Sequence, residues 1–182
     1  MNFYTDLILF DQRISASLVY WRRDFFDGFF LFITQFGHWP VIIILTVLAV
    51  GVFYLLKRRN LIGPLLLTVA GSGLCAVGLK SLVDRARPGP DIAVYVEKLS
   101  SFPSAHAALI LALGGFLLYS LRWFKIGRTA KIGLSLLLLL LILLVGFSRV
   151  YLGVHFLSDV LAGYLIGFIW VLIGTARVKR RV

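Results

Sequence analysis

The chain has 182 residues, of which 60% are apolar, and a mean hydropathy of +0.94. This composition excludes an ordinary soluble domain, because several apolar runs approach the ~20 residues that a helix needs to cross a bilayer. The formal net charge is +11, which in a soluble protein would suggest a nucleic-acid partner. Here the positions of the charges indicate membrane orientation instead, so no nucleic acid is expected. A single cysteine, Cys75, excludes a disulfide framework and a cysteine metal site.

Residues 1–37 are predicted to form an N-terminal amphipathic segment. Apolar residues recur at three- and four-residue spacing between polar ones, at Phe3, Leu7, Phe10 and Ile14, which indicates a helix with one apolar face. An aromatic stretch follows at 25–37 and either lies at the membrane interface or dips into the membrane. We interpret the whole segment as an interfacial anchor without chemistry of its own.

Five apolar runs follow, and each is long enough to be considered as a membrane span. They occupy residues 40–56, 61–82, 104–121, 132–147 and 156–176. The sequence therefore predicts an all-α, polytopic membrane bundle over residues 38–176, with about five or six transmembrane helices. A short basic tail, 177–182, completes the chain.

The charges between the runs predict how the bundle is oriented. The loops 57–60 and 122–131 and the tail 177–182 together contain eleven Lys and Arg and no acidic residue. The positive-inside rule places these three segments in the cytoplasm. The loop 83–103 and the turn 148–155 then face the opposite side of the membrane, and so does the segment around His38.

Three polar clusters fall on that opposite side, and the turn before the last span carries the first of them. It contains Arg149, His155 and Asp159 between two strongly apolar runs. His155 and Asp159 are four residues apart, so on a helix they share one face. A carboxylate there can hold one imidazole nitrogen and leave the other free to attack or to accept a proton.

The second cluster lies at the end of the run 61–82. Lys80 and Arg87 are seven residues apart, two helical turns, and share a face if the helix continues as far as Pro88. Taken alone, the two cations could equally be side chains that reach the interface, with Lys80 paired to Asp84.

The third cluster opens the run 104–121. Pro103 and Ser104 precede an Ala- and Leu-rich stretch and predict a helix start. Free N–H groups and a serine hydroxyl at such a start bind phosphate well, and His106 lies in the first turn. The alternative for this cluster is a helix cap with an interfacial histidine.

Together the clusters bring three cations, two histidines and one carboxylate to one membrane face. Three clustered cations repel one another unless an anion lies among them, and a phosphoryl group fits that arrangement. One histidine can attack phosphorus while the other protonates the leaving oxygen. No carboxylate pair or histidine cage suggests a metal, so Lys and Arg are expected to neutralise the charge.

These residues resemble the type-2 phosphatidic acid phosphatase superfamily, which shares its site with vanadium haloperoxidases. The family pattern is Lys-x6-Arg-Pro, then Pro-Ser-Gly-His, then Ser-Arg-x5-His-x3-Asp. The chain matches all three parts in order, over roughly residues 25–176, and departs at one position, where Ala105 replaces the glycine. The backbone N–H is kept, but the methyl group can narrow the pocket.

The resemblance implies a role for each matched residue. His155 is implied as the nucleophile that forms a phosphohistidine, Asp159 as its orienting carboxylate, and His106 as the general acid and later the base. The phosphate-binding groups implied by the family pattern are Lys80, Arg87, Arg149, Ser104 and the backbone at Ala105. The resemblance also implies metal-independent chemistry without a cofactor.

The resemblance further implies a membrane lipid substrate and a multi-pass protein of the bacterial inner membrane. The expected site faces the periplasm and the C-terminus faces the cytoplasm. Three lipids remain open as substrates: phosphatidylglycerol phosphate, undecaprenyl pyrophosphate and the 1-phosphate of lipid A. The headgroup, the oligomeric state and the side of the N-terminus are not predicted.

Other functions remain to be weighed against hydrolysis of a lipid phosphate. A phosphotransferase with the same site would pass the phosphoryl group to another lipid or sugar. A non-enzymatic ion or proton carrier would use the charges as a path, but these gather at one interface. Two further residues are assigned from position alone: His38 to an interfacial turn, and Arg85 to contact with either a substrate headgroup or anionic lipid.

Overall fold

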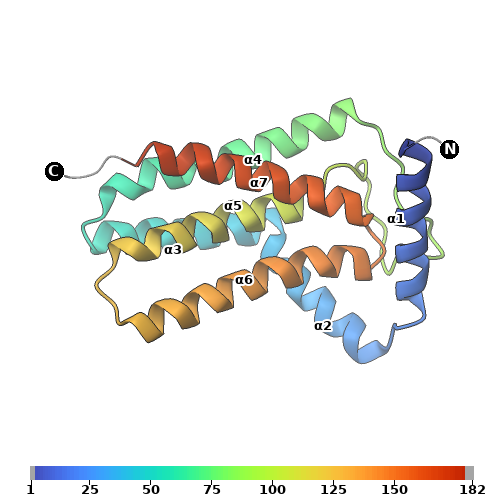
Figure 1. The fold of residues 1–182 in the computed structure, drawn as a ribbon, viewed down its shortest axis with the longest axis horizontal. Helices are drawn as coiled ribbons and strands as arrows, with labels where there is room; N and C mark the ends of the chain where they lie inside the picture. Colours follow the sequence, from blue (N-terminus) through green and yellow to red (C-terminus); the bar gives the residue numbers. More distant parts are fainter. Residues whose placement is uncertain (1–2, 179–182) are drawn as a thin grey trace.

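The computed structural model describes residues 3–178, and every regular element in that range is helical (Figure 1). The α-helices in this range are α1 (Phe3–Val19), α2 (Asp24–Thr34), α3 (Trp39–Leu55), α4 (Ile62–Leu82), α5 (Ala105–Ser120), α6 (Arg128–Tyr151) and α7 (Leu157–Ala176). Short 3-10 turns lie at η1 (Gln35–Gly37), η2 (Arg59–Leu61) and η3 (Leu121–Trp123). The predicted all-α membrane fold is confirmed.

Four helical segments in the described range are long and apolar enough to cross a membrane, and they contain α4, α5, α6 and α7. The helices α2 and α3 form a pair bent by 55° that passes the same test as one broken span, which raises the number to five. The bend falls at His38, between the 3-10 turn η1 and the helix start at Trp39-Pro40. Proline suits this position because the first turn of a helix needs no backbone N–H donor there.

The predicted span boundaries agree with the helices to within one residue for α4, α5 and α7. Helix α6 is longer than the predicted run 132–147 at both ends, because residues 128–131 and 148–151 are also helical. Only 17% of its apolar window is buried inside the protein. Much of the Leu-rich surface of α6 is therefore available to lipid, as its composition predicts.

Helix α5 occupies the middle of the bundle and packs against α4, α6 and α7 (Figure 1). Its contact with α7 is close because two glycines of α7 face it. A Cβ atom at Gly163 would come within 2.4 Å of the carbonyl oxygen of Ser104, and one at Gly167 within 2.6 Å of that of Ala108. Small residues at such positions allow two helix backbones to approach each other in a membrane protein.

Helix α1 lies across one end of the bundle, beside the loop that joins α4 to α5 (Figure 1). Its exposed side carries large apolar residues, with Phe10 55% exposed, next to charged Asp6 and Arg13, while Asp11 and Ser15 are 1% exposed. The predicted amphipathic helix is therefore present, but its buried side contains polar groups. Exposed apolar and charged side chains on one helix suit a helix that lies in a membrane interface.

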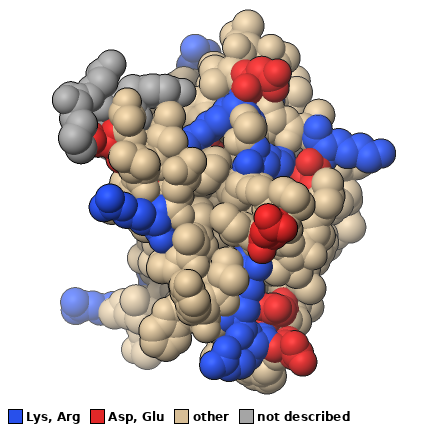
Figure 2. All heavy atoms as spheres, turned by 90° about the vertical axis from the view of Figure 1, so that its right-hand side faces the viewer, with Lys and Arg blue, Asp and Glu red and all other residues tan. Residues whose placement is uncertain are grey.

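The two ends of the bundle differ in charge. The eight acidic residues of the chain lie in α1, in the first turns of α2 and α7, and in the loop 83–104. Figure 2 looks onto this end and shows acidic and basic side chains next to one another. The basic loops at 57–60 and 122–127 connect helices at the other end, toward the described C-terminus (Figure 1). Residues 179–182 of the predicted basic tail lie outside the described range.

Candidate active site

The turn between α6 and α7 places the predicted nucleophile. Val154 and His155 both donate backbone N–H groups to the carbonyl oxygen of Arg149, at 3.2 and 3.1 Å. Gly153 enters this turn with a φ of +67°, a conformation that glycine adopts without a steric penalty. The result is a tight reversal that returns His155 to the end of α6, where Arg149 lies.

His155 and Asp159 are close together, but not as neighbours on one helix. Helix α7 begins at Leu157, so His155 lies in the turn before it, and its Nδ1 is 3.6 Å from the Asp159 Oδ2. The same oxygen accepts hydrogen bonds from the Ser101 hydroxyl at 2.5 Å and from the Phe156 backbone N–H at 2.9 Å. The carboxylate is thus fixed on one side of the ring, which leaves Nε2 on the other.

The second nitrogen of His155 faces cationic groups. Its Nε2 lies 3.4 Å from the Arg87 Nη1, and the side chain as a whole is 1% exposed. Burial lowers the pKa of His155 to about 4. The positive charges of Arg149, Arg87 and Lys80 also lower it, whereas the nearby Asp159 carboxylate raises it. The imidazole is therefore neutral at pH 7, with a lone pair available for attack.

Lys80 and Arg87 meet through the loop and not through a continuous helix. Helix α4 ends at Leu82, so the predicted shared helical face does not exist. Instead the loop folds back and offers carbonyl groups to both cations. The Lys80 Nζ donates to the carbonyl of Ser100 at 2.6 Å, and the Arg87 Nη2 donates to the same oxygen at 3.3 Å. The Arg87 Nη1 also donates to the Val154 carbonyl at 2.5 Å.

Arg149 is the most deeply buried of the predicted cations, at 0% exposure. Its Nη1 donates to the hydroxyl groups of Thr34 and Tyr95, at 2.7 and 2.5 Å, and its Nη2 binds Glu97. The Nε of Arg149 has no hydrogen-bond partner among the described residues. A buried guanidinium donor without a partner is costly, and an anion beside it would remove that cost.

Glu97 joins the two arginines in a way that the sequence did not predict. One carboxylate oxygen lies 2.8 Å from the Arg87 Nη2, and the other binds Arg149. Burial alone would raise the pKa of Glu97, but the charges of Arg149 and Arg87 outweigh it and lower this pKa. The carboxylate is therefore charged at neutral pH and occupies space between two predicted phosphate-binding groups.

His106 lies in the first turn of α5, and the predicted helix start is present. Ser104 is the N-cap residue: its hydroxyl accepts from the Ala107 N–H at 3.5 Å, and its own N–H donates to the Asp159 carbonyl at 3.0 Å. Ser104 is fully buried and does not line the pocket, whereas Ala105 and His106 do. In this structure the Ser104 hydroxyl therefore caps α5 and does not face the pocket in which a phosphate would bind.

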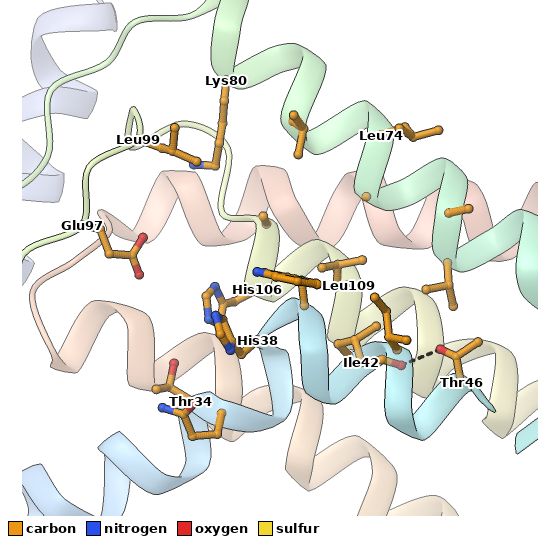
Figure 3. A pocket seen from close by; sticks show the side chains of 18 of the residues that line it. Thr34, His38, Ile42, Thr46, Leu74, Lys80, Glu97, Leu99, His106 and Leu109 are labelled. Carbon is orange, nitrogen blue, oxygen red and sulfur yellow. Dashed lines mark hydrogen bonds between the residues drawn. The ribbon is translucent and has the colours of Figure 1, made fainter. Parts of the chain in front are cut away.

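A third histidine lies beside His106. His38 was assigned to an interfacial turn, and it does lie at the break between η1 and α3, but its ring stacks on His106. The ring centroids are 5.8 Å apart and the planes differ by 21°. Figure 3 shows the two rings together in the pocket, below Lys80 and opposite Glu97. The only sequence signal for this position was that the membrane topology put His38 on the same side as the other polar clusters.

One pocket of about 1120 Å³ connects these groups to the apolar part of the bundle. Its polar end is lined by Lys80, Arg87, Glu97, His38, His106 and His155. The rest is lined mainly by apolar side chains of α3 and α4, among them Ile43, Val47, Leu66 and Leu74. Arg149 and Asp159 contact residues of the polar end without lining the pocket themselves. No group of three or more His, Cys, Asp or Glu side chains in the described range is arranged to hold a metal ion.

A helical membrane bundle with histidines and cations at the mouth of an apolar pocket defines a class: a membrane-embedded enzyme that acts on an anionic group. The family model of the PAP2 superfamily matches residues 61–182. The chain belongs to the PAP2 superfamily.

Known proteins resemble the chain over most of its length. Phosphatidylglycerophosphatase B of Bacillus subtilis (strain 168) is 32% identical over 166 residues, which cover 87% of this chain and 78% of the relative. The structure of a transmembrane PAP2-type phosphatidylglycerolphosphate phosphatase from Bacillus subtilis superposes with a TM-score of 0.79 and 29% identity, covering 94% of this chain and 87% of the other. Aquifex aeolicus LpxE superposes with a TM-score of 0.73 and 25% identity, over 93% and 94% of the two chains. These likenesses indicate a membrane phosphatase.

Proposed function

We propose that the chain hydrolyses a phosphate ester of a membrane lipid through a phosphohistidine at His155. The observation that carries this proposal is the single pocket that contains both His106 and His155 together with Lys80 and Arg87. A neutral imidazole, a second imidazole and two cations around one space are the parts that phosphoryl transfer to a histidine requires.

The first step would form one bond and break another at phosphorus. The Nε2 of His155 attacks, because Nδ1 is turned to Asp159. The bond between phosphorus and the lipid oxygen breaks, and His106 gives that oxygen a proton, so the lipid leaves as an alcohol. Asp159 stabilises the positive charge that develops on the imidazole, in the manner of other carboxylate–histidine pairs.

The second step would return the enzyme to its starting state. His106, now neutral, accepts a proton from a water molecule, whose oxygen attacks the phosphohistidine. The bond between phosphorus and Nε2 breaks and inorganic phosphate is released. Throughout, Lys80 and Arg87 bind the phosphoryl oxygens, the N–H groups at Ala105 and His106 assist, and Arg149 adds positive charge from behind the pocket wall. The proposal assigns charge neutralisation to these cations and needs no metal.

The apolar lining of the pocket supports a lipid as the substrate. A pocket whose polar end contains cations and whose remainder is lined by aliphatic residues of α3 and α4 suits a headgroup phosphate attached to hydrocarbon. The Bacillus subtilis sequence and structure that resemble the chain are named for phosphatidylglycerol phosphate, and we propose this lipid as the first substrate to test. Undecaprenyl pyrophosphate and the 1-phosphate of lipid A follow.

The proposed site faces the periplasm of a bacterial inner membrane, and the C-terminus faces the cytoplasm. The basic loops at the far end of the bundle support this orientation, since cytoplasmic loops are enriched in Lys and Arg. Cysteine labelling of intact cells at an introduced cysteine in loop 83–104 would test it. Labelling by a membrane-impermeant reagent is expected, whereas protection would reverse the orientation.

The decisive experiment measures phosphate release by the purified protein in one detergent, with each of the three lipids. Wild type is expected to release phosphate in the presence of a chelator, and His155→Ala to lose at least about 10³-fold in kcat. An adduct trapped with labelled substrate is expected to survive alkali and to be lost in acid. Activity that the chelator abolishes, or that His155→Ala retains, would overturn the proposal.

A further inference from the structure

The N-terminal helix α1 contains a buried acid that the catalytic proposal does not use. Asp11 is 1% exposed, although Asp6 on the same helix is exposed. A carboxylate buried in this way is stable only if its oxygens have partners. Its Oδ1 accepts from the Ser158 backbone N–H at 3.0 Å, and its Oδ2 accepts from the Arg85 Nη2 at 2.8 Å and from the Ser158 hydroxyl.

Arg85 connects this acid to the catalytic carboxylate. Its Nη2 binds Asp11, while its Nη1 donates to the Asp159 Oδ1 at 2.5 Å and to the Ser158 hydroxyl at 2.7 Å. The guanidinium also lies over the Phe156 ring, 4.5 Å from its centroid. Both arms of Arg85 are therefore occupied by carboxylates from two different helices, α1 and α7.

Asp159 divides its two oxygens between this arginine and the nucleophile. Oδ1 binds Arg85, and Oδ2 faces the His155 Nδ1 at 3.6 Å. A continuous line of charged groups thus runs from α1 to the pocket, in the order Asp11, Arg85, Asp159 and His155. Asp11 does not line the pocket and is positioned to act only through the other members.

We propose that Asp11 is a positioning residue for the nucleophile: it holds one arm of Arg85 so that the other arm fixes Asp159, and through Asp159 it orients His155. This inference rests on the proposed function, because it assigns His155 as the nucleophile. Two carboxylates balance the arginine. Without Asp11, the full charge of Arg85 falls on Asp159, which then stabilises a positively charged imidazole less well.

The test compares Asp11→Asn with Asp6→Asn, a matched control that removes the same charge from an exposed position of α1. Asp11→Asn is expected to lower kcat about 10-fold to 100-fold, as loss of an outer partner of a ligand or catalytic group does. KM and inhibition by inorganic phosphate should stay within about twofold, because Lys80 and Arg87 are untouched. Asp11→Glu, which restores the charge, is expected to regain most of the loss.

A second readout needs no substrate and separates this inference from the proposed function. The chain has three histidines, so ¹⁵N-histidine labelling allows His155 to be titrated by NMR. Asp11→Asn should lower the pKa of His155 further, because it removes negative charge, and Asp6→Asn should not. The charged and titratable groups around His155 that stay constant in this comparison are Asp159, Arg149, Arg87, Lys80, Glu97, Arg85 and His106.

The outcomes can be told apart. A wild type that releases no lipid phosphate would overturn the proposed function, whatever the titration gives. An active wild type with equal kcat and equal His155 titration in Asp11→Asn and Asp6→Asn would overturn the role of Asp11 alone. If Asp11→Asn does not fold, Arg85→Lys keeps one positive charge but cannot reach Asp11 and Asp159 together, and an unchanged kcat there would also overturn it.

Discussion

The two halves of the site are held in opposite ways. In the nucleophile half, His155 and Asp159, the partners lie behind the reacting nitrogen: Ser101 and Arg85 bind the carboxylate on the side away from the pocket. In the cation half, Arg87 and Arg149, the principal ionic partner is Glu97, whose carboxylate lines the pocket itself. The partners of the nucleophile half therefore lie outside the pocket, whereas the partner of the cation half, Glu97, lies in the space that a substrate would enter.

This difference indicates which parts of the site change partners during a catalytic cycle. The nucleophile half can receive a phosphoryl group while Asp159 keeps its contacts with Ser101 and Arg85, and only the approach of Arg87 to Nε2 must change. The cation half must exchange one anion, Glu97, for another, the phosphate. We expect substitutions in the first half to act on the rate of the chemical step and those in the second to act on affinity.

The largest effect is expected from His106, which completes the chemistry of the nucleophile half. His106→Gln should lower kcat for a lipid phosphate about 10²-fold to 10⁴-fold, the usual contribution of a general acid. With p-nitrophenyl phosphate, whose leaving group needs no proton, the loss should be far smaller. Steady-state kinetics on both substrates checks this, and equal losses would assign His106 a structural role.

Arg87→Lys tests the cation half and should raise KM about tenfold with a smaller change in kcat. Lysine cannot reproduce the forked contacts of Arg87 with Glu97, Ser100 and Val154. Lys98→Ala, in the same loop but exposed, is the matched control. If kcat falls by a larger factor than KM rises, Arg87 acts on the chemical step like the nucleophile half, and the proposed difference between the two halves is wrong.

The pH dependence of kcat/KM tests the nucleophile half. Because burial lowers the pKa of His155 to about 4, the reactive neutral ring persists as the pH falls from 7. The value of kcat/KM should therefore show no loss due to His155 until about pH 4, and then fall about tenfold per pH unit. An acid limb near pH 6.5, the ordinary value for histidine, would mean that water reaches this ring.

The smallest effect is expected from Glu97→Gln, which removes the competing charge. Inhibition by inorganic phosphate should strengthen by a few-fold, and phosphate should raise the unfolding temperature of the variant more than that of wild type. Asp91→Asn, exposed in the same loop, is the control. Weaker phosphate binding in Glu97→Gln would show that Glu97 braces the arginines and does not compete with the ligand.

Sequence patterns predicted the helical bundle and the end of the bundle at which the site residues gather, because both depend on local signals. Apolar runs located the spans of α4, α5 and α7, and the parity of basic loops put Lys80, His106 and His155 at one end. The pattern misjudged how two pairs meet. Lys80 and Arg87 come together through the loop because α4 ends at Leu82, and His155 precedes α7 because the chain must first turn at Gly153.

The partners of the catalytic groups could not be predicted, because they come from segments without periodicity or from distant parts of the chain. Glu97 and Tyr95 belong to an irregular loop, where neither helical nor strand spacing indicates which side chains point inward. Asp11 reaches Arg85 across 74 residues of sequence. A polar residue on an amphipathic helix predicts contact with water, and only the packing of α1 against α7 reverses that expectation for Asp11.

Gly163 of α7 affects the geometry of the site although it is not part of it. Gly163 lets the backbone of α7 touch that of α5 one turn below Asp159, where the Asp159 carbonyl accepts the Ser104 N–H. The absence of a side chain at Gly163 therefore helps to set the distance between α5, which contains His106, and α7, which follows His155. An alanine in place of Gly163 would push α5 and α7 apart, and so separate the two imidazoles without changing any catalytic residue.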